Sequence, residues 1–167
     1  SGMRQDWGGK GFNVSRALHA LGVESVAMGF VGGATGRMLT EGLQGLGIAT
    51  DFVPIEGETR TNTVIEEAGS GRYIKVNEPG PAVTQEDLDA LFAKVSSRAW
   101  AGSVWVFCGR LPPGARADVY ARLIAAVQDK GGLACLDTSG EALRLGCAAG
   151  PYLVKPNAEE AEEQTGY

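Results

Sequence analysis

Residues 7–15 read Trp-Gly-Gly-Lys-Gly-Phe-Asn-Val-Ser, directly in front of a stretch with the apolar spacing of a helix. Glycine at three of these positions lets the backbone approach a ligand without an intervening Cβ atom. The helix that follows presents unpaired N–H groups and the positive end of its dipole, and Lys10 adds a full charge. The stretch therefore predicts an anion site, with Asn13 either capping the helix or donating to a hydroxyl group. An ordinary glycine-rich turn is the alternative.

The spacing of these glycines disfavours two common nucleotide-binding loops. Lys10 is followed by glycine rather than serine or threonine, and no glycine lies five residues before Gly9, so the stretch is not a Walker A loop. Gly9 and Gly11 are not followed by a third glycine at the dinucleotide-binding spacing either. A Rossmann-like dinucleotide enzyme is therefore disfavoured.

Length and composition fit one globular domain with a core of its own. The chain has 167 residues and a net charge of −5, and it offers no basic face to nucleic acid or to an anionic membrane. Its apolar runs are strand-sized, so we expect neither a membrane span nor a secretion signal. Its three cysteines are widely spaced without a CxxC pair, which favours buried thiols in a reducing cytoplasm over disulfides or zinc.

Apolar stretches of strand length alternate with stretches of helical spacing along most of the chain, which predicts an α/β fold with a parallel sheet between helices. Two alternating segments, 60–67 and 72–77, flank the turn 68–71 and predict a β-hairpin. The predicted helices are 14–21, 38–46, 84–95, 118–130, 141–145 and 157–164, and the other predicted strands are 24–31, 51–55, 103–108, 133–136 and 152–154.

From Gly8 the sequence continues through Gly22 to Gly32 with a spacing that resembles the N-terminal signature of the ribokinase-like, PfkB-type carbohydrate kinases. The lysine between the glycines is most similar to the 1-phosphofructokinase and tagatose-6-phosphate kinase branch. The resemblance implies a three-layer α/β/α parallel sheet with a small β-hairpin lid, incomplete at both ends. Residues 1–167 would form part of a kinase domain, with the lid strands at about 51–78.

Within this resemblance, three segments would bind a sugar phosphate. Thr59-Arg60-Thr61-Asn62 is similar to the segment whose arginine holds the substrate phosphate, since a guanidinium can grip a phosphate with two hydrogen bonds. The loop 109–114, Gly-Arg-Leu-Pro-Pro-Gly, resembles the family's Gly-Ser-Leu-Pro-Pro-Gly loop but carries Arg110 at the small hydroxyl position. The implied substrate-binding residues are Gly8, Gly9, Lys10, Asn13, Arg60, Asn62, Gly109 and Arg110.

Two later segments resemble the nucleotide side of the same enzymes. They place Asp137, Lys155, Asn157 and Glu160 near ATP, and the last two form an Asn-x-x-Glu motif that implies Mg²⁺ held through water. Asn157 and Glu160 also have the spacing of a helix capping box, and both interpretations can hold together. Lys155 could equally be a solvated lysine at the end of a strand.

The family's Gly-Ala-Gly-Asp segment, which supplies the catalytic base, does not occur in residues 1–167. We therefore expect this chain alone to contain no catalytic residue and to be inactive. The resemblance implies ATP-dependent phosphorylation of fructose 1-phosphate, with tagatose-6-phosphate or fructose-6-phosphate kinase and a non-catalytic sugar-phosphate module as alternatives. It also implies a homodimer through the lid strands and a cytoplasmic location, with no nucleic-acid or membrane partner.

Overall fold

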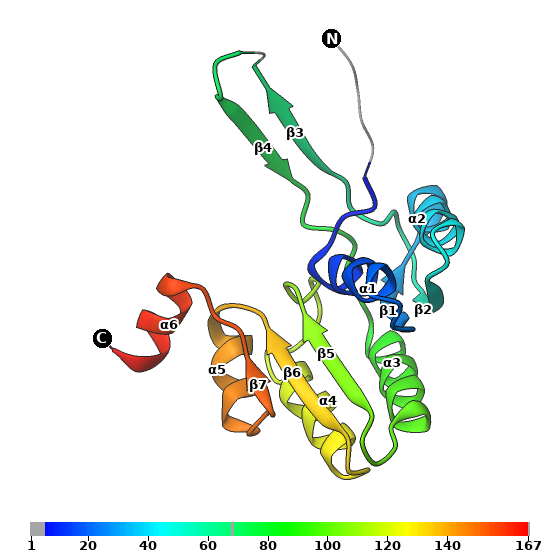
Figure 1. The fold of residues 1–167 in the computed structure, drawn as a ribbon, viewed down its shortest axis with the longest axis vertical. Helices are drawn as coiled ribbons and strands as arrows, with labels where there is room; N and C mark the ends of the chain where they lie inside the picture. Colours follow the sequence, from blue (N-terminus) through cyan, green and yellow to red (C-terminus); the bar gives the residue numbers. More distant parts are fainter. Residues whose placement is uncertain (1–5, 68, 167) are drawn as a thin grey trace.

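The computed structural model describes residues 6–67 and 69–166, and Figure 1 shows their fold. The order of elements matches the predicted alternation of strands and helices. The helices are α1 (Lys10–Ala20), α2 (Gly33–Gly45), α3 (Gln85–Arg98), α4 (Val119–Gln128), α5 (Gly140–Ala148) and α6 (Ala158–Thr165). The strands are β1 (Val26–Val31), β2 (Ala49–Pro54), β3 (Asn62–Glu66), β4 (Tyr73–Asn77), β5 (Val104–Cys108), β6 (Leu133–Asp137) and β7 (Leu153–Val154).

The parallel strands form two separate sheets among the described residues, whereas the sequence predicted one. β1 pairs with β2, and β5, β6 and β7 pair in that order. No backbone hydrogen bonds join β1 to β5 in the part of the chain that the structure describes. Helix α1 contacts both strands instead, and Figure 1 shows it between the two sheets. Strand pairing is a non-local property, so the alternation of elements alone did not reveal this division.

The alternation of side chains along β1 shows how the layers are built. Ala27 and Val31 pack into a core cluster beneath α1 and α2, which also contains Leu43. Met28 and Phe30 point the other way, toward a larger cluster formed mainly by α3, α4 and α5. Helices therefore cover both faces of the β1–β2 sheet, which confirms the predicted α/β/α layering there.

Within residues 6–67 and 69–166, one face of the β5–β7 sheet packs on the core, whereas the other meets α1 at Cys108 and is exposed elsewhere. Trp105 and Phe107 pack against the larger core cluster, beneath α4. Val104, which points to the opposite face, is 64% exposed, and Val106 and Leu153 are also exposed. An apolar sheet face of this kind is a surface on which other protein segments can pack.

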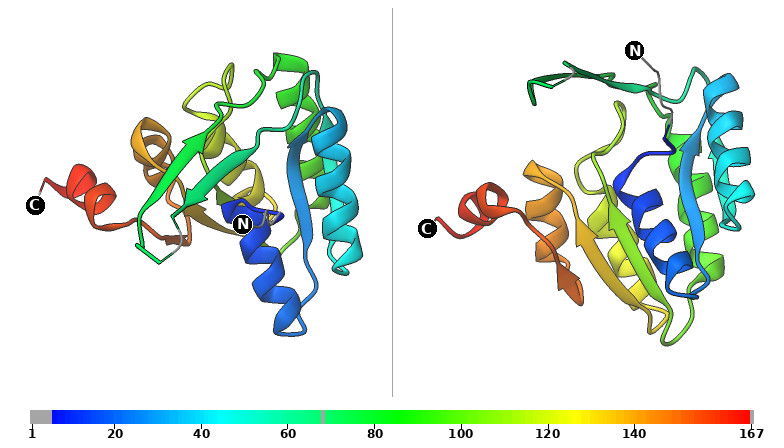
Figure 2. Two further views of the ribbon diagram at one scale, coloured as in Figure 1. Left: turned by 90° about the horizontal axis from the view of Figure 1, so that it is seen from above. Right: turned by 45° about the horizontal axis from the view of Figure 1, so that its top comes forward.

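The predicted hairpin is present and projects from the body beyond the carboxyl ends of β5 and β6 (Figure 2). β3 and β4 pair antiparallel with Asn62 opposite Asn77, and every residue of both strands is exposed. Ala68 of the predicted turn lies outside the described residues. The strand predicted at 51–55 pairs with β1 as part of β2, so it belongs to the parallel sheet rather than to the projecting hairpin.

Helix α1 begins at Lys10, four residues before the predicted start. Gly9 precedes it as the N-cap with φ 139°, a backbone conformation that favours glycine, and no side chain caps the helix. Asn13 lies inside the first turn and is exposed, so the prediction that it caps the helix was wrong. The first turn includes Gly11, where a Cβ atom would lie 3.4 Å from Cys108 Sγ, an ordinary contact distance.

Two helix starts predicted from capping boxes are confirmed. The Thr84 hydroxyl accepts a hydrogen bond from the backbone N–H of Asp87, and the Thr84 N–H donates to the Asp87 carboxylate. Helix α3 begins directly after Thr84. Asn157 and Glu160 make the same pair of bonds at the start of α6. None of the helices among the described residues has the length and apolar character needed to cross a membrane.

Asp51→Asn is expected to lower the free energy of unfolding by about 1–2 kcal/mol at pH 7, because two partly exposed ion pairs tie β2 to α3. Asp51 accepts hydrogen bonds from Lys94 and from Arg98. The bond from Lys94, followed by that from Arg98, lowers the pKa of Asp51 below its ordinary value of 3.8. Such a carboxylate contributes stability above its unfolded-state pKa and loses it as the pH falls through the folded-state pKa.

The parent and Asp51→Asn should therefore show the whole of this difference in the free energy of unfolding, measured with urea, at pH 7. It should shrink as the pH falls below about 4, which is near the unfolded-state pKa. Asp129→Asn, at the exposed end of α4, is the matched control and should show no comparable loss. A difference for Asp51→Asn that stays constant with pH would contradict this role for the ion pairs.

Candidate functional site

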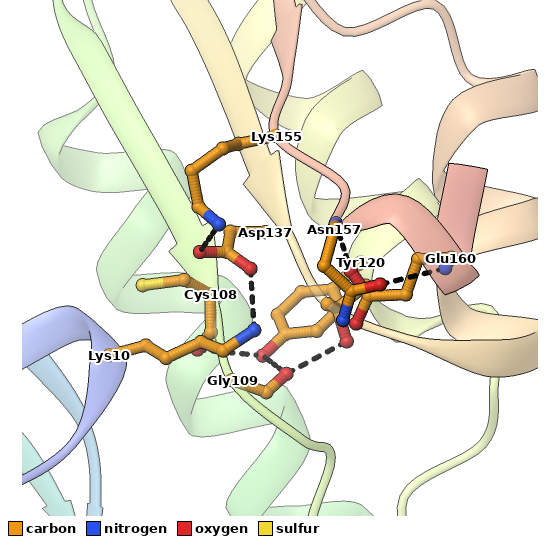
Figure 3. A network of polar contacts seen from close by, with 9 residues as sticks. Lys10, Cys108, Gly109, Tyr120, Asp137, Lys155, Asn157 and Glu160 are labelled. Atoms are coloured by element: carbon orange, nitrogen blue, oxygen red, sulfur yellow. Dashed lines mark hydrogen bonds and ion pairs between the residues drawn. The ribbon is translucent and has the colours of Figure 1, made fainter.

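The carboxyl ends of β5, β6 and β7 lie along one edge of their parallel sheet, and the N-terminus of α1 approaches the same edge (Figure 3). Asp137, the last residue of β6, accepts a hydrogen bond from Lys10 Nζ at 2.6 Å. Its other oxygen lies 3.1 Å from Lys155 Nζ. Residues 127 positions apart in the sequence therefore meet at one carboxylate. The edge contains both ammonium groups that the sequence assigned to anionic ligands.

The hydrogen bonds of this group keep Asp137 and Lys10 charged. Burial by itself raises the pKa of Asp137, whose side chain is only 14% exposed. Hydrogen bonds from Lys10 and then Lys155 outweigh that effect, so its pKa is lowered overall. The hydrogen bond to Asp137 raises the pKa of Lys10, and the negative charge of Glu160 adds to this increase. Lys10 thus presents a permanent positive charge at neutral pH, 48% exposed and open to an anion.

The backbone at the end of β5 is held by two hydroxyl groups that the sequence did not identify. Tyr120, from α4, donates to the carbonyl oxygens of Cys108 and Gly109, both at 3.1 Å. Thr138 donates to the Gly109 carbonyl at 2.8 Å. Burial raises the pKa of Tyr120 well above its ordinary value, so its hydroxyl remains a donor. A tyrosine on the apolar side of a predicted helix was the only sequence signal for this anchor.

The loop after Gly109 is rigid and leaves its arginine exposed. Pro113 accepts a backbone hydrogen bond from Val83 at 2.9 Å, and a Cβ atom at Gly114 would lie 2.3 Å from the Val83 carbonyl oxygen. Arg110 is exposed at the start of this loop. Its contribution to substrate binding stays a prediction.

Arg60 lies at the entrance to the hairpin, where a Cβ atom on Gly80 would lie 3.5 Å from the Arg60 Cβ. It is exposed, and its positive charge acts on the Tyr120 hydroxyl, whose pKa it lowers in part. The structure therefore places its charge within electrostatic reach of the group that anchors Gly109. Asn62 lies two residues further on, in β3 and exposed. Gly8 and Gly9, also exposed, lead into α1.

The Asn157–Glu160 pair fits a water-mediated magnesium contact. Asn157 Oδ1 accepts the Glu160 N–H, and Glu160 Oε2 accepts the Asn157 N–H, each at 2.8 Å. The second carboxylate oxygen of Glu160 is left to meet a water molecule. In the described ranges, no three or more His, Cys, Asp or Glu side chains are grouped so that they could hold a metal ion. Mg²⁺ keeps several of its waters and is usually held by one or two carboxylates together with substrate phosphates, so a single carboxylate such as that of Glu160 suits it.

The cysteines carry no disulfide among the described residues. Cys108, Cys135 and Cys147 are free and each is half-buried, so the prediction of buried thiols is only partly confirmed. Burial raises the pKa of Cys108, beside Lys10 and Asp137, which keeps it a neutral thiol.

Comparison with known protein families shows which family this chain belongs to. The sequence pattern of the family described as pfkB family carbohydrate kinase matches residues 1–167. The chain belongs to the pfkB family. The pfkB kinases are carbohydrate kinases, and the resemblance noted in the sequence is therefore confirmed.

Curated pfkB relatives include both enzymes of the expected branch. The chain is 35% identical over 159 residues to a 1-phosphofructokinase from Bacillus subtilis, covering 95% of this chain and 51% of the relative. It is 32% identical over 162 residues to a tagatose-6-phosphate kinase from Staphylococcus epidermidis, covering 96% and 52%. The chain thus spans about half the length of the curated relatives that it matches.

Among solved pfkB structures, phosphofructokinase-2 from Escherichia coli is 34% identical to this chain. Its structure in complex with substrates and products matches with a TM-score of 0.90, covering 95% of this chain and 52% of that one. The tetrameric inhibited form of the same enzyme matches with a TM-score of 0.88, covering 94% and 52%. The expected ribokinase-like fold is therefore confirmed.

Proposed function

We propose that this chain forms the sugar-phosphate-binding part of an ATP-dependent kinase that converts fructose 1-phosphate to fructose 1,6-bisphosphate. The observation that carries this proposal is Lys10, an exposed and permanently charged ammonium group at the start of α1, above the carboxyl edge of β5 and β6. A cation at this position suits a substrate that already bears a phosphate. Asp137 uses only one of the three donors of this ammonium group, so Lys10 can also donate to a phosphate oxygen, and a neutral sugar would not make use of its charge.

In this proposal Lys10 and Arg60 bind the phosphate that the sugar already carries. Backbone N–H groups near Gly8 and Gly9 add contacts to the same anion, as glycine does at other anion sites. The sugar hydroxyls lie between Asn13, Asn62, Gly109 and Arg110. Tyr120 and Thr138 support this arrangement because they fix the Gly109 carbonyl and the start of its loop.

The nucleotide side is assigned to Asp137, Lys155, Asn157 and Glu160. ATP with Mg²⁺ supplies the phosphoryl group, which passes to a sugar hydroxyl oxygen as the bond to ADP breaks and the hydroxyl proton is released. Lys155 binds phosphate oxygens, and Glu160 orients water around the ion. Asp137 holds Lys10 and Lys155 in place, because it bonds to both.

Tagatose 6-phosphate and fructose 6-phosphate are the alternative substrates, since a tagatose-6-phosphate kinase and a 6-phosphofructokinase are both 32% identical to this chain. We also propose that the hairpin pairs with a second copy. Val64, Ile65, Ile74 and Val76 are all more than half exposed on it, which is unusual for apolar side chains of an unpartnered hairpin. We also propose a cytoplasmic location, which the three free cysteines support.

A ligand panel tests the proposed function. Thermal unfolding of the chain should shift upward with fructose 1-phosphate, and less or not at all with ribose, adenosine or inorganic phosphate at equal concentration. Tagatose 6-phosphate and fructose 6-phosphate in the same panel distinguish the alternative substrates. Stabilisation by ribose together with no response to any hexose phosphate would overturn the proposal.

A further inference from the structure

The segment 57–60 is held against the N-terminus of α2 by side chains that no sequence motif indicated. The Glu58 carboxylate accepts the backbone N–H groups of Ala34 at 3.0 Å and Thr35 at 2.9 Å. The Thr59 hydroxyl accepts the N–H of Gly32 at 2.9 Å, and the Thr59 N–H donates to the Gly32 carbonyl at 3.0 Å. Two consecutive residues thus make four hydrogen bonds to one short stretch of backbone.

The surface that receives this segment is shaped by the absence of side chains. A Cβ atom at Gly33 would lie 2.1 Å from the Glu58 carboxylate, and one at Gly32 would lie 2.4 Å from the Gly57 carbonyl oxygen. The two glycines, predicted only as a turn before a helix, are therefore required for the close approach of residues 57–59. Gly33 also has φ 65°, which suits glycine.

Charge favours the same contact. The first N–H groups of α2 have no partner within the helix, and its dipole is positive at this end. Hydrogen bonds from Thr35 and then Ala34 lower the pKa of Glu58, so the carboxylate is ionised at neutral pH. The nearby positive charge of Arg37 acts in the same direction.

Arg60 lies between this contact and the second arm of the hairpin, where a Cβ atom on Gly80 would lie 3.5 Å from the Arg60 Cβ. It comes directly after Thr59, and the hairpin beyond it is exposed at every residue of both strands, so the hairpin itself contributes no core packing. The next backbone N–H, that of Thr61, donates to Glu78 across the base of the hairpin at 2.8 Å. That bond ties the two arms of the hairpin together, and the second arm is tied to the loop after Gly109 where the Val83 N–H donates to the Pro113 carbonyl at 2.9 Å. The first arm, which carries Arg60, is tied to the body by Glu58 and Thr59.

We propose that Glu58 is a positioning residue, which docks on the N-terminus of α2 and thereby holds Arg60 beside the Gly109 loop before a phosphosugar binds. The role of Arg60 as a phosphate ligand rests on the proposed function. Glu58 itself touches neither the substrate nor the nucleotide in this arrangement. It acts through Thr59 and the backbone that leads to Arg60.

The first test is a double-mutant cycle measured by calorimetric titration of fructose 1-phosphate. Glu58→Ala should weaken binding by about 2–5-fold, the scale of a carboxylate at an exposed helix N-terminus. The same change made in an Arg60→Ala background should have almost no further effect, because Glu58 acts through Arg60. Glu58→Gln keeps one acceptor oxygen and should restore part of the affinity. Glu56→Ala, an exposed neighbour in the same loop, is the matched control.

The second test needs no ligand and measures the rate of tryptic cleavage after Arg60. Cleavage there should be faster in Glu58→Ala than in the parent, whereas cleavage after Arg72, at the far end of the hairpin, should be unchanged. Equal cleavage rates after Arg60, or additive effects in the cycle, would overturn the proposal. If the parent binds no phosphosugar, the proposed function fails, while the cleavage rates still decide whether Glu58 holds Arg60.

Discussion

Gly32→Ala is expected to destabilise the chain by about 2–4 kcal/mol, a large effect for the addition of one methyl group. The backbone of Gly32 is extended, with φ −146°, so alanine can adopt it without strain. The cost comes from space alone. The new methyl group would lie 2.4 Å from the Gly57 carbonyl oxygen and 2.7 Å from that of Ile55, and backbone atoms cannot move aside as a side chain can.

The measurement is urea-induced unfolding, followed by circular dichroism. Gly45→Ala, at the other end of α2, is the matched control, because a Cβ atom there meets nothing within 4 Å. That change should stabilise the chain by about 0.5–1 kcal/mol, since alanine is the better helix former. If Gly32→Ala and Gly45→Ala behaved alike, the close docking of residues 55–57 on the start of α2 would be contradicted.

Lys10→Ala is expected to weaken fructose 1-phosphate binding by about 1.5–3 kcal/mol, or about 10–150-fold, the usual scale for a hydrogen bond to a charged group. Two effects add in this variant. The phosphate loses a cation, and the carboxylate of Asp137 loses one of its two partners and so repels the incoming anion more strongly. Arg60→Ala should fall in the same range without the second effect.

Calorimetric titration measures both variants under identical salt, because screening weakens exposed charges. Lys130→Ala is the control, since this lysine precedes the start of β6 and lies at the opposite end of that strand from Asp137. Unchanged affinity in both Lys10→Ala and Arg60→Ala, with a parent that binds, would show that the phosphate is held elsewhere.

Features with a local cause could be predicted from the sequence. The capping boxes at Thr84 and Asn157 depend on residues three positions apart, and both helices begin where those residues require. The hairpin likewise depends on alternation around one turn. The start of α1 was misplaced because glycine is a poor helix former, so the run before Val14 was interpreted as a loop. In the folded chain residues 10–12 nevertheless belong to α1.

Contacts between distant residues could not be predicted from the residues alone. Glu58 meets partners 23 and 24 positions earlier, and nothing in its surroundings distinguishes it from Glu56. The separation of the parallel strands into two sheets and the Tyr120 anchor depend on tertiary packing in the same way. Lys10 and Asp137 were each identified as site residues, but their ion pair became visible only in the folded chain.

One carboxylate shared by two ammonium groups has a thermodynamic consequence. An anion that draws Lys10 away from Asp137 leaves Lys155 as the only partner of that carboxylate. The electrostatic potential at Lys155, and so the affinity of any ligand bound there, then changes. Binding at the two lysines is then energetically linked. Linkage is reciprocal, so whatever the first ligand does to the affinity of the second, the second does equally to the first. Asp137 would carry that coupling free energy through its ion pairs with the two lysines.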